Sequence, residues 1–271
     1  MSNTSQRILV SVIAIPLIIA ACYFGEEFFL LFILGIGILS FIEFSNMAKQ
    51  KESYSNLYVG LISVAALIIN SFYNFIDFQI LVILIIFILF FAELFRNKDS
   101  AVYNLGATLI GIFYIGLFSS SLILIREFFN YSGFVYHQGG YLIISLLITI
   151  WVCDSAAFFL GTAFGKHKIF PRVSPKKSVE GAIAGLVFSI ITMLAAKLII
   201  VEFLSWADAI AIGFIVGVIG QAGDFVESLL KRDTGVKDSS SIIPGHGGIF
   251  DRFDSLLFSA PVVYIYIHYW L

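Results

Sequence analysis

Acidic and basic side chains are concentrated where the last two apolar stretches of the sequence meet. Asp224, Glu227 and Lys231 are spaced i, i+3 and i+7, so that on a helix they share one face. Asp251 and Asp254 are three residues apart at the start of the next apolar stretch. Carboxylate oxygens are the ligands that Mg²⁺ prefers, usually one or two from the protein and the rest from water or phosphate. The four acids therefore predict a metal site.

The same acids could instead take part only in salt bridges between helices. Lys231 lies one turn beyond Glu227, and Arg252 stands between Asp251 and Asp254. A charge inside a membrane is costly unless it is paired, so such bridges would also account for these residues. The sequence leaves both interpretations open.

Two segments that precede apolar stretches have residues suited to binding phosphate. Segment 174–181 reads SPKKSVEG and places Lys176 and Lys177 beside hydroxyl groups. Segment 244–248 reads PGHGG, and its glycines would let backbone amides approach an anion near a helix N-terminus. Lysines, a glycine-rich turn and metal-binding acids together indicate a polyphosphate site. Attraction to anionic lipid headgroups would explain the lysines, but not the glycines or the acids.

The elements that carry these residues are predicted to be membrane-spanning helices. The chain is 59% hydrophobic and only 13% charged, whereas soluble domains are roughly 45–50% apolar and about 25% charged. Its net charge of −2 excludes nucleic acid as a favoured partner. A spanning helix needs about 20 apolar residues. We therefore expect an all-α polytopic protein of the lipid bilayer, with nine spans at 8–24, 28–45, 57–72, 78–95, 104–125, 140–164, 181–201, 207–230 and 250–270.

Loop charges predict the orientation of these spans. With a cytoplasmic N-terminus, the inside segments hold 13 of the 16 Lys and Arg residues, and the outside segments hold only Arg126. Such a bias predicts a cytoplasmic N-terminus and an outside C-terminus, with cytoplasmic loops at 165–180 and 231–249. Glu43 and Glu93 lie near the cytoplasmic ends of the second and fourth spans, where we expect them to snorkel to solvent.

The chain is expected to have two parts. Residues 1–135 contain few polar residues and are predicted to form a scaffold or dimerisation part. Residues 136–271 contain the polar loops and are predicted to be the catalytic part. Asp154 lies within the sixth apolar run, followed by small residues at Ala157, Gly161 and Gly165. That spacing predicts a close contact between two helices.

Segment 228–254, SLLKRDTGVKDSSSIIPGHGGIFDRFD, resembles the diagnostic motif of the phosphatidate cytidylyltransferase (CDP-diacylglycerol synthase) family. The motif is S-x-x-K-R-x4-K-D-x4-[LI]-P-x-H-G-G-x-x-D-R-x-D. Its matching positions are Ser228, Lys231, Arg232, Lys237, Asp238, Ile243, Pro244, His246, Gly247, Gly248, Asp251, Arg252 and Asp254. Segment 151–166, with Asp154, and segment 174–181 are similar to two further regions of the family, although Ser178 stands where Thr is frequent.

The resemblance implies a reaction of CTP with phosphatidic acid that gives CDP-diacylglycerol and pyrophosphate. It also implies Mg²⁺, a monovalent cation such as K⁺, a homodimer, and an active site open to the cytoplasm. The lack of extra domains suits an enzyme of a bacterial inner membrane. We expect Asp224 and Asp251 to be the main metal ligands, supported by Asp154, Glu227 or Asp254. Catalytic roles are expected for Asp154, Asp224, Lys231, His246, Asp251 and Arg252. Substrate contacts are expected for Ser174, Lys176, Lys177, Ser178, Ser228, Arg232, Lys237, Asp238, Gly247 and Gly248.

Two other functions are compatible with some of these features. A CTP-dependent lipid kinase would direct attack by an alcohol at the terminal phosphorus, and His246 would then serve as the base. A transporter could use the embedded acids for ion coupling. Transporters commonly show two structural repeats, however, and here the polar residues are confined to one half without a mirrored partner.

Overall fold

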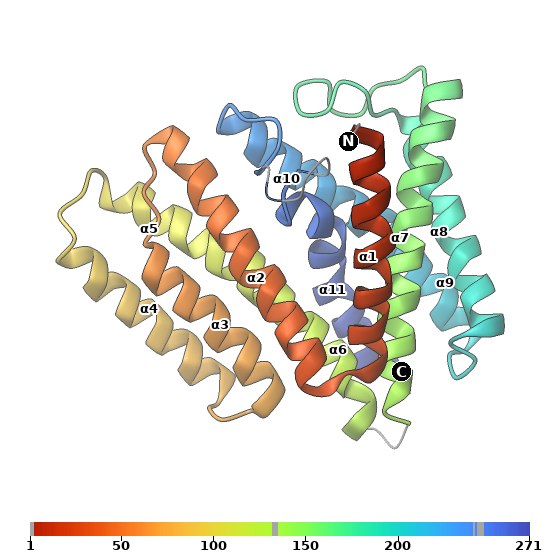
Figure 1. Cartoon of the computed structure of the whole chain (residues 1–271), viewed down its shortest axis with the longest axis horizontal. Coiled ribbons are helices and arrows are strands. Elements are labelled where there is room, and N and C mark those ends of the chain that lie inside the picture. The colour runs from red at the N-terminus through yellow and green to blue at the C-terminus, as the bar shows by residue number, and fades with distance from the viewer. Residues whose placement is uncertain (1–2, 132–134, 241, 243–246) are drawn as a thin grey trace. The chain divides into compact units, whose positions relative to one another are not determined.

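The structure is a computed structural model that describes residues 3–131, 135–240, 242 and 247–271, which form helices and connecting turns (Figure 1). An isolated β-bridge joins Lys168 to Ser178. The helices are α1 (Asn3–Phe24), α2 (Glu26–Ala48), η1 (Lys49–Lys51), α3 (Leu57–Tyr73), α4 (Phe78–Leu94), α5 (Ala101–Ile110), η2 (Gly111–Leu117), α6 (Phe118–Tyr131), α7 (His137–Phe164), α8 (Val179–Ile199), α9 (Trp206–Ile215), η3 (Val216–Gly220), α10 (Gln221–Asp233) and α11 (Phe250–Trp270).

Each apolar run that the sequence analysis identified is helical in the described part of the chain. Two of the runs are not continuous α-helices, because the short π-helices η2 and η3 lie within them. Helices long and apolar enough to cross a membrane are found at Glu26–Lys49, Ala101–Phe129, His137–Phe164, Val179–Ile199 and Trp206–Asp233. The all-helical class and these five candidate spans are thus established, whereas the count of nine spans and their orientation stay predictions.

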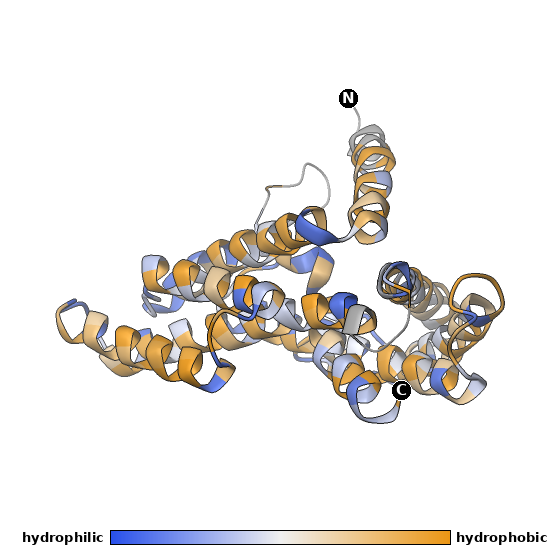
Figure 2. Ribbon diagram, turned by 90° about the horizontal axis from the view of Figure 1, so that it is seen from below, coloured by the Kyte–Doolittle hydropathy of each residue, from blue (hydrophilic) through white to orange (hydrophobic). Residues whose placement is uncertain are grey.

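Local sequence explains where several helices begin. Asn56, Asp77, Ser100 and Ser205 precede α3, α4, α5 and α9, and the side chain of each accepts a hydrogen bond from a backbone amide of the first turn. Such caps satisfy amides that have no partner within the helix. Figure 2 shows that hydrophobic residues make up most of each helix. Many large apolar side chains of these helices are exposed, as expected where lipid rather than water surrounds them.

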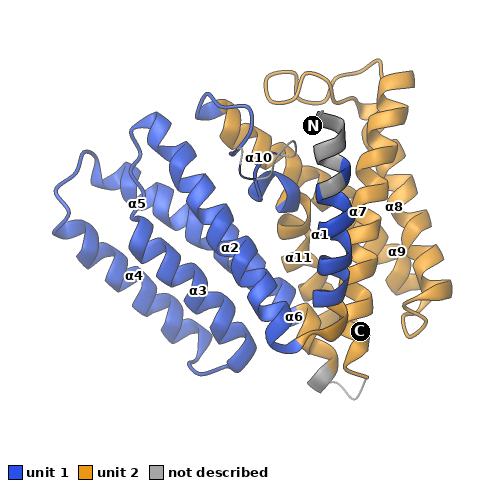
Figure 3. Cartoon of the chain, in the orientation of Figure 1, with its two compact units in different colours: residues 1–21, 26–124, 233–253 blue, residues 22–25, 125–232, 254–271 orange. Residues whose placement is uncertain are grey.

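The chain divides into two compact units that are interleaved in sequence (Figure 3). Unit 1 comprises residues 1–21, 26–124 and 233–253, and unit 2 comprises residues 22–25, 125–232 and 254–271. The proposed scaffold and catalytic roles of 1–135 and 136–271 stay predictions. The loop between α10 and α11, together with the first turn of α11, belongs to unit 1.

Unit 1 contains a buried polar cluster around Glu93 in α4. The side-chain amide of Asn104 donates to Oε1 of Glu93 at 2.7 Å, and Nη1 of Arg96 donates to Oε2 at 3.2 Å. Only 7% of Glu93 is exposed. The expectation that Glu93 snorkels to solvent is therefore wrong, because its partners come from α5 and from the turn that follows α4.

Unit 2 is organised around the pairing of α7 with α8. At Gly181 an added Cβ would lie 2.7 Å from the carbonyl oxygen of Ala157 and 2.9 Å from Cα of Gly161. The two backbones can approach so closely only because these positions carry little or no side chain. This confirms the helix contact that the row of small residues predicted.

Arg126 of α6 is a fully buried side chain of unit 2. Its guanidinium donates to the carbonyl oxygens of Cys22 at 3.0 Å, Tyr23 at 3.3 Å and Tyr136 at 2.9 Å. The first two carbonyls belong to the last turn of α1, where they have no acceptor role within the helix. Arg126 thus joins the end of α1 to the start of α7.

We expect Arg126→Met to lower the free energy of unfolding by about 3 kcal/mol, because three carbonyl oxygens lose charge-assisted hydrogen bonds to a buried guanidinium. Thermal unfolding of the purified protein in detergent would measure the change. Arg172→Met removes an exposed arginine and should shift stability by less than about 0.5 kcal/mol. Equal unfolding temperatures for the two variants would contradict this role of Arg126.

Candidate active site

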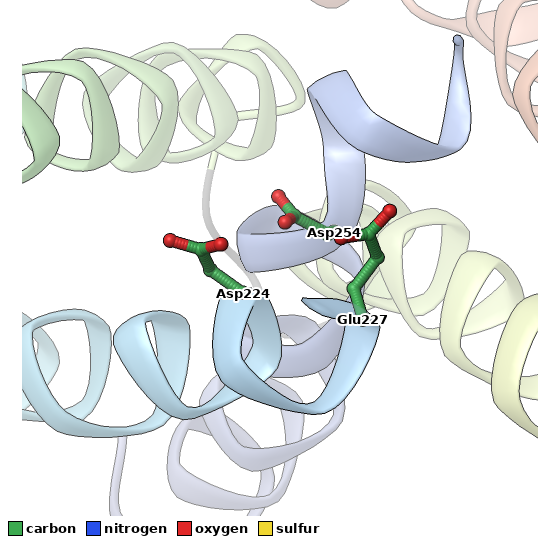
Figure 4. Close-up of side chains that lie close together, drawn as sticks. All are labelled: Asp224, Glu227 and Asp254. Atoms are coloured by element: carbon green, nitrogen blue, oxygen red, sulfur yellow. The ribbon is translucent and has the colours of Figure 1, made fainter. Parts of the chain in front are cut away.

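Three carboxylates of unit 2 lie close together (Figure 4). Asp224 and Glu227 are one turn apart on α10, and Asp254 comes from α11. One oxygen from each carboxylate lies within 4.8 Å of the others. Because a hard cation binds oxygens at about 2.0–2.6 Å, ligands on its opposite sides are separated by roughly 4–5 Å. The three carboxylates could therefore share one cation.

Gly223 allows α10 and α11 to approach closely enough to form this group. A Cβ at Gly223 would lie 2.4 Å from Cβ of Phe258 and 3.0 Å from the carbonyl oxygen of Asp254. Any larger residue would push the helices apart and with them the carboxylates of Asp224 and Asp254. The glycine is thus required by packing at the site rather than by backbone conformation.

Gln221 fixes the start of α10 immediately after the π-helix η3. Its side-chain amide donates to the carbonyl oxygens of Gly217 at 2.5 Å and of Ala182 in α8 at 3.1 Å. A π-helix displaces backbone carbonyls from their usual partners, and such segments are frequent beside functional residues. Gln221 satisfies the carbonyl of Gly217 within η3 and joins the start of α10 to Ala182 of α8.

Two lysines pair with the acids of α10. Lys177, from the loop between α7 and α8, forms an ion pair with Asp224 and lies over the ring of Phe225 at 4.8 Å from its centroid. Lys231 pairs with Glu227 at 2.6 Å, one turn further along α10. The site therefore combines three carboxylates with two ammonium groups.

The environment of Lys177 shifts its pKa. Its partial burial lowers the pKa of the ammonium, although the charges of Asp254, Asp154 and Glu227 act in the opposite direction. A desolvated ammonium is a stronger electrostatic partner for an anion than one in water. Lys177 is accordingly suited to contact a phosphate that enters the site.

The loop from Gly165 to Ser178 is held at its start by Glu180 in the first turn of α8. Glu180 accepts bonds from the amides of Lys166 and His167, and its Oε1 lies 2.6 Å from Nδ1 of His167. His167 therefore has a carboxylate partner. Ser178 is buried and caps α8 by accepting a bond from the amide of Gly181 at 3.3 Å.

In unit 1, Asp251 organises the end of the loop between α10 and α11. Its carboxylate accepts hydrogen bonds from the amides of Ser239 and Gly248, each at 3.0 Å. Gly247 has a φ of +85°, a conformation that favours glycine. The segment 247–251 thus has a defined conformation in which Asp251 is already hydrogen-bonded.

Residues 5–270 match a family model described as the cytidylyltransferase family. The chain belongs to this family. It is 32% identical to the phosphatidate cytidylyltransferase of Bacillus subtilis over 270 residues, which cover 97% of each chain. The protein of the same name from Thermotoga maritima is 30% identical over 272 residues, covering 98% of this chain and 96% of its own.

The acid group of this cytidylyltransferase family member is suited to a divalent cation. All of its donors are carboxylate oxygens, two of the three residues are buried, and they converge from two helices. Lys177 and Lys231 neutralise only part of the charge. Salt bridging and metal binding, which the sequence left as alternatives, thus involve the same carboxylates. Asp251 is not one of the three, and its role as a metal ligand stays a prediction.

The remaining predicted residues have diverse environments. Asp154 is exposed on α7, and Ser228 is buried on α10 next to Asp224. Arg232 is exposed and donates to the carbonyl oxygen of Val173 at 3.3 Å. His246 lies outside the described residues. Exposed side chains are found at Lys176, Lys237, Asp238 and Arg252, and the partly buried Ser174 donates its amide to the carbonyl oxygen of Phe170.

Sequence reasoning missed three contributors to these arrangements. Gln221 gave no signal beyond its place after a glycine-rich stretch, and Phe225 is one of many aromatic residues in the chain. Glu43 was expected to reach solvent, yet it is completely buried. Its partners lie about 200 positions away in the sequence, so no local pattern could reveal them.

Proposed function

We propose that this chain is a CTP:phosphatidate cytidylyltransferase, which transfers CMP from CTP to phosphatidic acid and releases pyrophosphate. The observation that carries the proposal is the match of residues 5–270 to the cytidylyltransferase family, together with the similarity of nearly the whole chain to bacterial phosphatidate cytidylyltransferases. The helices able to cross a membrane suit an enzyme whose second substrate and product are lipids.

The reaction needs positioned charges more than an activated nucleophile. An oxygen of the lipid phosphate attacks the α-phosphorus of CTP, a new P–O bond forms, and the bond between the α-phosphorus and the bridging oxygen of the β-phosphate breaks. The pyrophosphate leaves with the electrons of that bond. A phosphate monoester already carries negative charge at neutral pH, so no side chain has to remove a proton from it. Catalysis then depends on bringing several anions together.

The charged residues of unit 2 are suited to that task. Asp224, Glu227 and Asp254 would hold Mg²⁺, with Asp251 as a further predicted ligand. The bound cation would supply positive charge to the polyphosphate and its leaving group. Lys177 and Lys231 are placed to exchange a carboxylate partner for a phosphate oxygen, because each already lies at the acid group. A monovalent cation such as K⁺ remains part of the proposal.

The membrane arrangement follows from the same assignment. We propose nine spans with the N-terminus in the cytoplasm and the C-terminus outside, in the inner membrane of a bacterium. CTP is a cytoplasmic nucleotide, so the acid group and the basic loop 165–180 would face that side. The protein is proposed to act as a homodimer, as the family resemblance implies.

Product analysis tests the reaction directly. Purified protein in detergent would be incubated with CTP, Mg²⁺ and phosphatidic acid, and nucleotide and phosphate products would be separated. We expect pyrophosphate to appear only when phosphatidic acid is present, with CDP-diacylglycerol formed in equal amount. Release of CDP on addition of a lipid alcohol would instead indicate a kinase. Absence of CTP turnover by folded protein under both conditions would contradict enzymatic cytidylyl transfer and favour transport.

A further inference from the structure

Glu43 is a completely buried acid in α2 whose carboxylate is surrounded by donors from one distant segment. Its Oε2 accepts hydrogen bonds from the amide of Phe250 at 2.8 Å and the hydroxyl of Ser239 at 3.0 Å. Its Oε1 accepts from the amide of Ile249 at 3.0 Å and the hydroxyl of Ser240 at 2.5 Å. A carboxylate offers about four acceptor sites. The loop before α11 and the start of that helix therefore fill all four acceptor sites of the Glu43 carboxylate.

This arrangement changes the interpretation of the glycine-rich turn. The sequence suggested that amides at the start of this helix approach a substrate phosphate. In the structure the amides of Ile249 and Phe250 donate to Glu43, so an internal carboxylate already occupies the positive end of α11. Gly248 faces the same carboxylate, and a Cβ there would lie 2.5 Å from Oε2 of Glu43 and 1.9 Å from Oγ of Ser239. Glycine is needed at 248 to let the loop reach Glu43.

The segment held in this way includes a residue with predicted chemistry. Asp251 follows Phe250 directly, and its carboxylate is fixed by the amides of Ser239 and Gly248. Ser239 bonds to both acids, since its hydroxyl donates to Glu43 and its amide donates to Asp251. A change at Glu43 would therefore affect Asp251 both through Ser239 and through the adjoining backbone of Ile249 and Phe250.

We propose that Glu43 is a positioning residue for the cytidylyl transfer proposed above, on which this inference rests. Its carboxylate holds 247–251 in the conformation that presents Asp251 to the substrates. The acid itself does not contact substrate, because its four acceptor sites are taken up by the protein. Residues that orient a ligand or catalytic group through hydrogen bonds typically contribute about 10–100-fold to metal affinity or activity.

Glu93 provides a matched control in the same unit. It is also a buried glutamate near the end of an apolar helix, and it also accepts side-chain hydrogen bonds. Its partners, Asn104 and Arg96, do not belong to the loop before α11. Loss of either carboxylate should weaken packing, but only loss of Glu43 should change the geometry of Asp251.

The test compares Glu43→Gln, Glu43→Asp and Glu93→Gln. In Glu43→Gln an NH₂ group must face the amide of Ile249 or Phe250, and a donor cannot accept a hydrogen bond from another donor. We expect kcat for pyrophosphate release to fall roughly 10–100-fold, with KM for phosphatidic acid little changed. Glu43→Asp retains four acceptor sites and should recover part of the loss. Glu93→Gln should unfold at a lower temperature but keep kcat near that of the wild type.

A second measurement does not depend on turnover. Hydrogen exchange followed by mass spectrometry should show faster exchange of peptides containing 247–251 in Glu43→Gln, and unchanged exchange there in Glu93→Gln. If the wild type fails to release pyrophosphate, the proposed reaction fails, while this measurement still decides whether Glu43 fixes the loop. Slow exchange in Glu43→Gln, or equal losses of kcat in both glutamine variants, would overturn the proposal. Should Glu43→Gln fail to fold, the double variant Ser239→Ala, Ser240→Ala removes two donors and should give the same pattern with a smaller loss.

Discussion

Asp224→Asn is expected to reduce kcat/KM for cytidylyl transfer by roughly 10²–10³-fold, the usual effect of removing one preorganised charge from an active site. Asp224 is the partly exposed member of the acid group and the partner of Lys177. Asparagine keeps its size but loses the negative charge and one acceptor oxygen. A divalent cation would then be bound by fewer anionic ligands, and Lys177 would lose its partner.

Initial rates of pyrophosphate release at several Mg²⁺ concentrations would measure this effect. Asp233→Asn is the matched control, because Asp233 ends the same helix, is exposed and lies outside the acid group. It should retain near-normal activity. If raised Mg²⁺ restores the Asp224 variant in part, the defect lies in metal binding. Activity of Asp224→Asn within twofold of the wild type would remove Asp224 from the site.

Asp224 is a cleaner probe of the metal site than Asp251, although both were predicted as ligands. The carboxylate of Asp251 accepts hydrogen bonds from the amides of Ser239 and Gly248. An asparagine at 251 would disturb that loop even if no metal ever bound there. Loss of activity in such a variant would therefore not separate metal binding from loop geometry.

Hydropathy was sufficient to locate the helices but not their internal irregularities. Backbone groups in lipid must be satisfied within the segment, so a long apolar run is almost obliged to be helical. The π-helices η2 and η3 change the hydrogen-bond pattern without changing the average hydropathy. Their positions depend on tertiary contacts such as those of Gln221, which donates to α8 across 39 positions of sequence. A single sequence contains no direct signal for such contacts.

The acids of α10 could be paired from sequence, because helical periodicity alone places Asp224 and Glu227 on one face. Asp254 was also a predicted member of the site. The position of Lys177 in this group depends on the path of the loop between α7 and α8. That path could be anticipated only as a general attraction between the basic loop and the acids.

Glu43 and Glu93 show why burial of a charge is hard to infer from its depth in a helix. Both were expected to extend to solvent, since a long side chain near a helix end usually can. In the structure each carboxylate accepts hydrogen bonds from other segments, and these bonds offset the desolvation cost of burial. The partners of Glu93 are within 11 positions, whereas those of Glu43 are 196 to 207 positions away.

Lys177→Met is expected to change turnover and metal affinity in opposite directions. Charge-assisted hydrogen bonds contribute about 1.5–3 kcal/mol, so the loss of one to a phosphate should lower kcat/KM for CTP roughly 10–100-fold. The ammonium also competes with any cation for the carboxylate of Asp224. Without it, the acid group has a higher negative charge and should bind a divalent cation more tightly.

Two measurements on the same preparation distinguish these effects. Steady-state kinetics gives kcat/KM for CTP, and titration with Mn²⁺ alone, followed by electron paramagnetic resonance, gives the affinity of the site without substrate. Lys168→Met is the control, because Lys168 is an exposed lysine of the same loop whose ammonium group donates to the carbonyl oxygen of Lys176 and lies outside the acid group. It should leave both quantities unchanged. Weaker Mn²⁺ binding in Lys177→Met would mean that the lysine supports the carboxylates structurally, whereas tighter binding with slower turnover requires that it act on the phosphates of CTP.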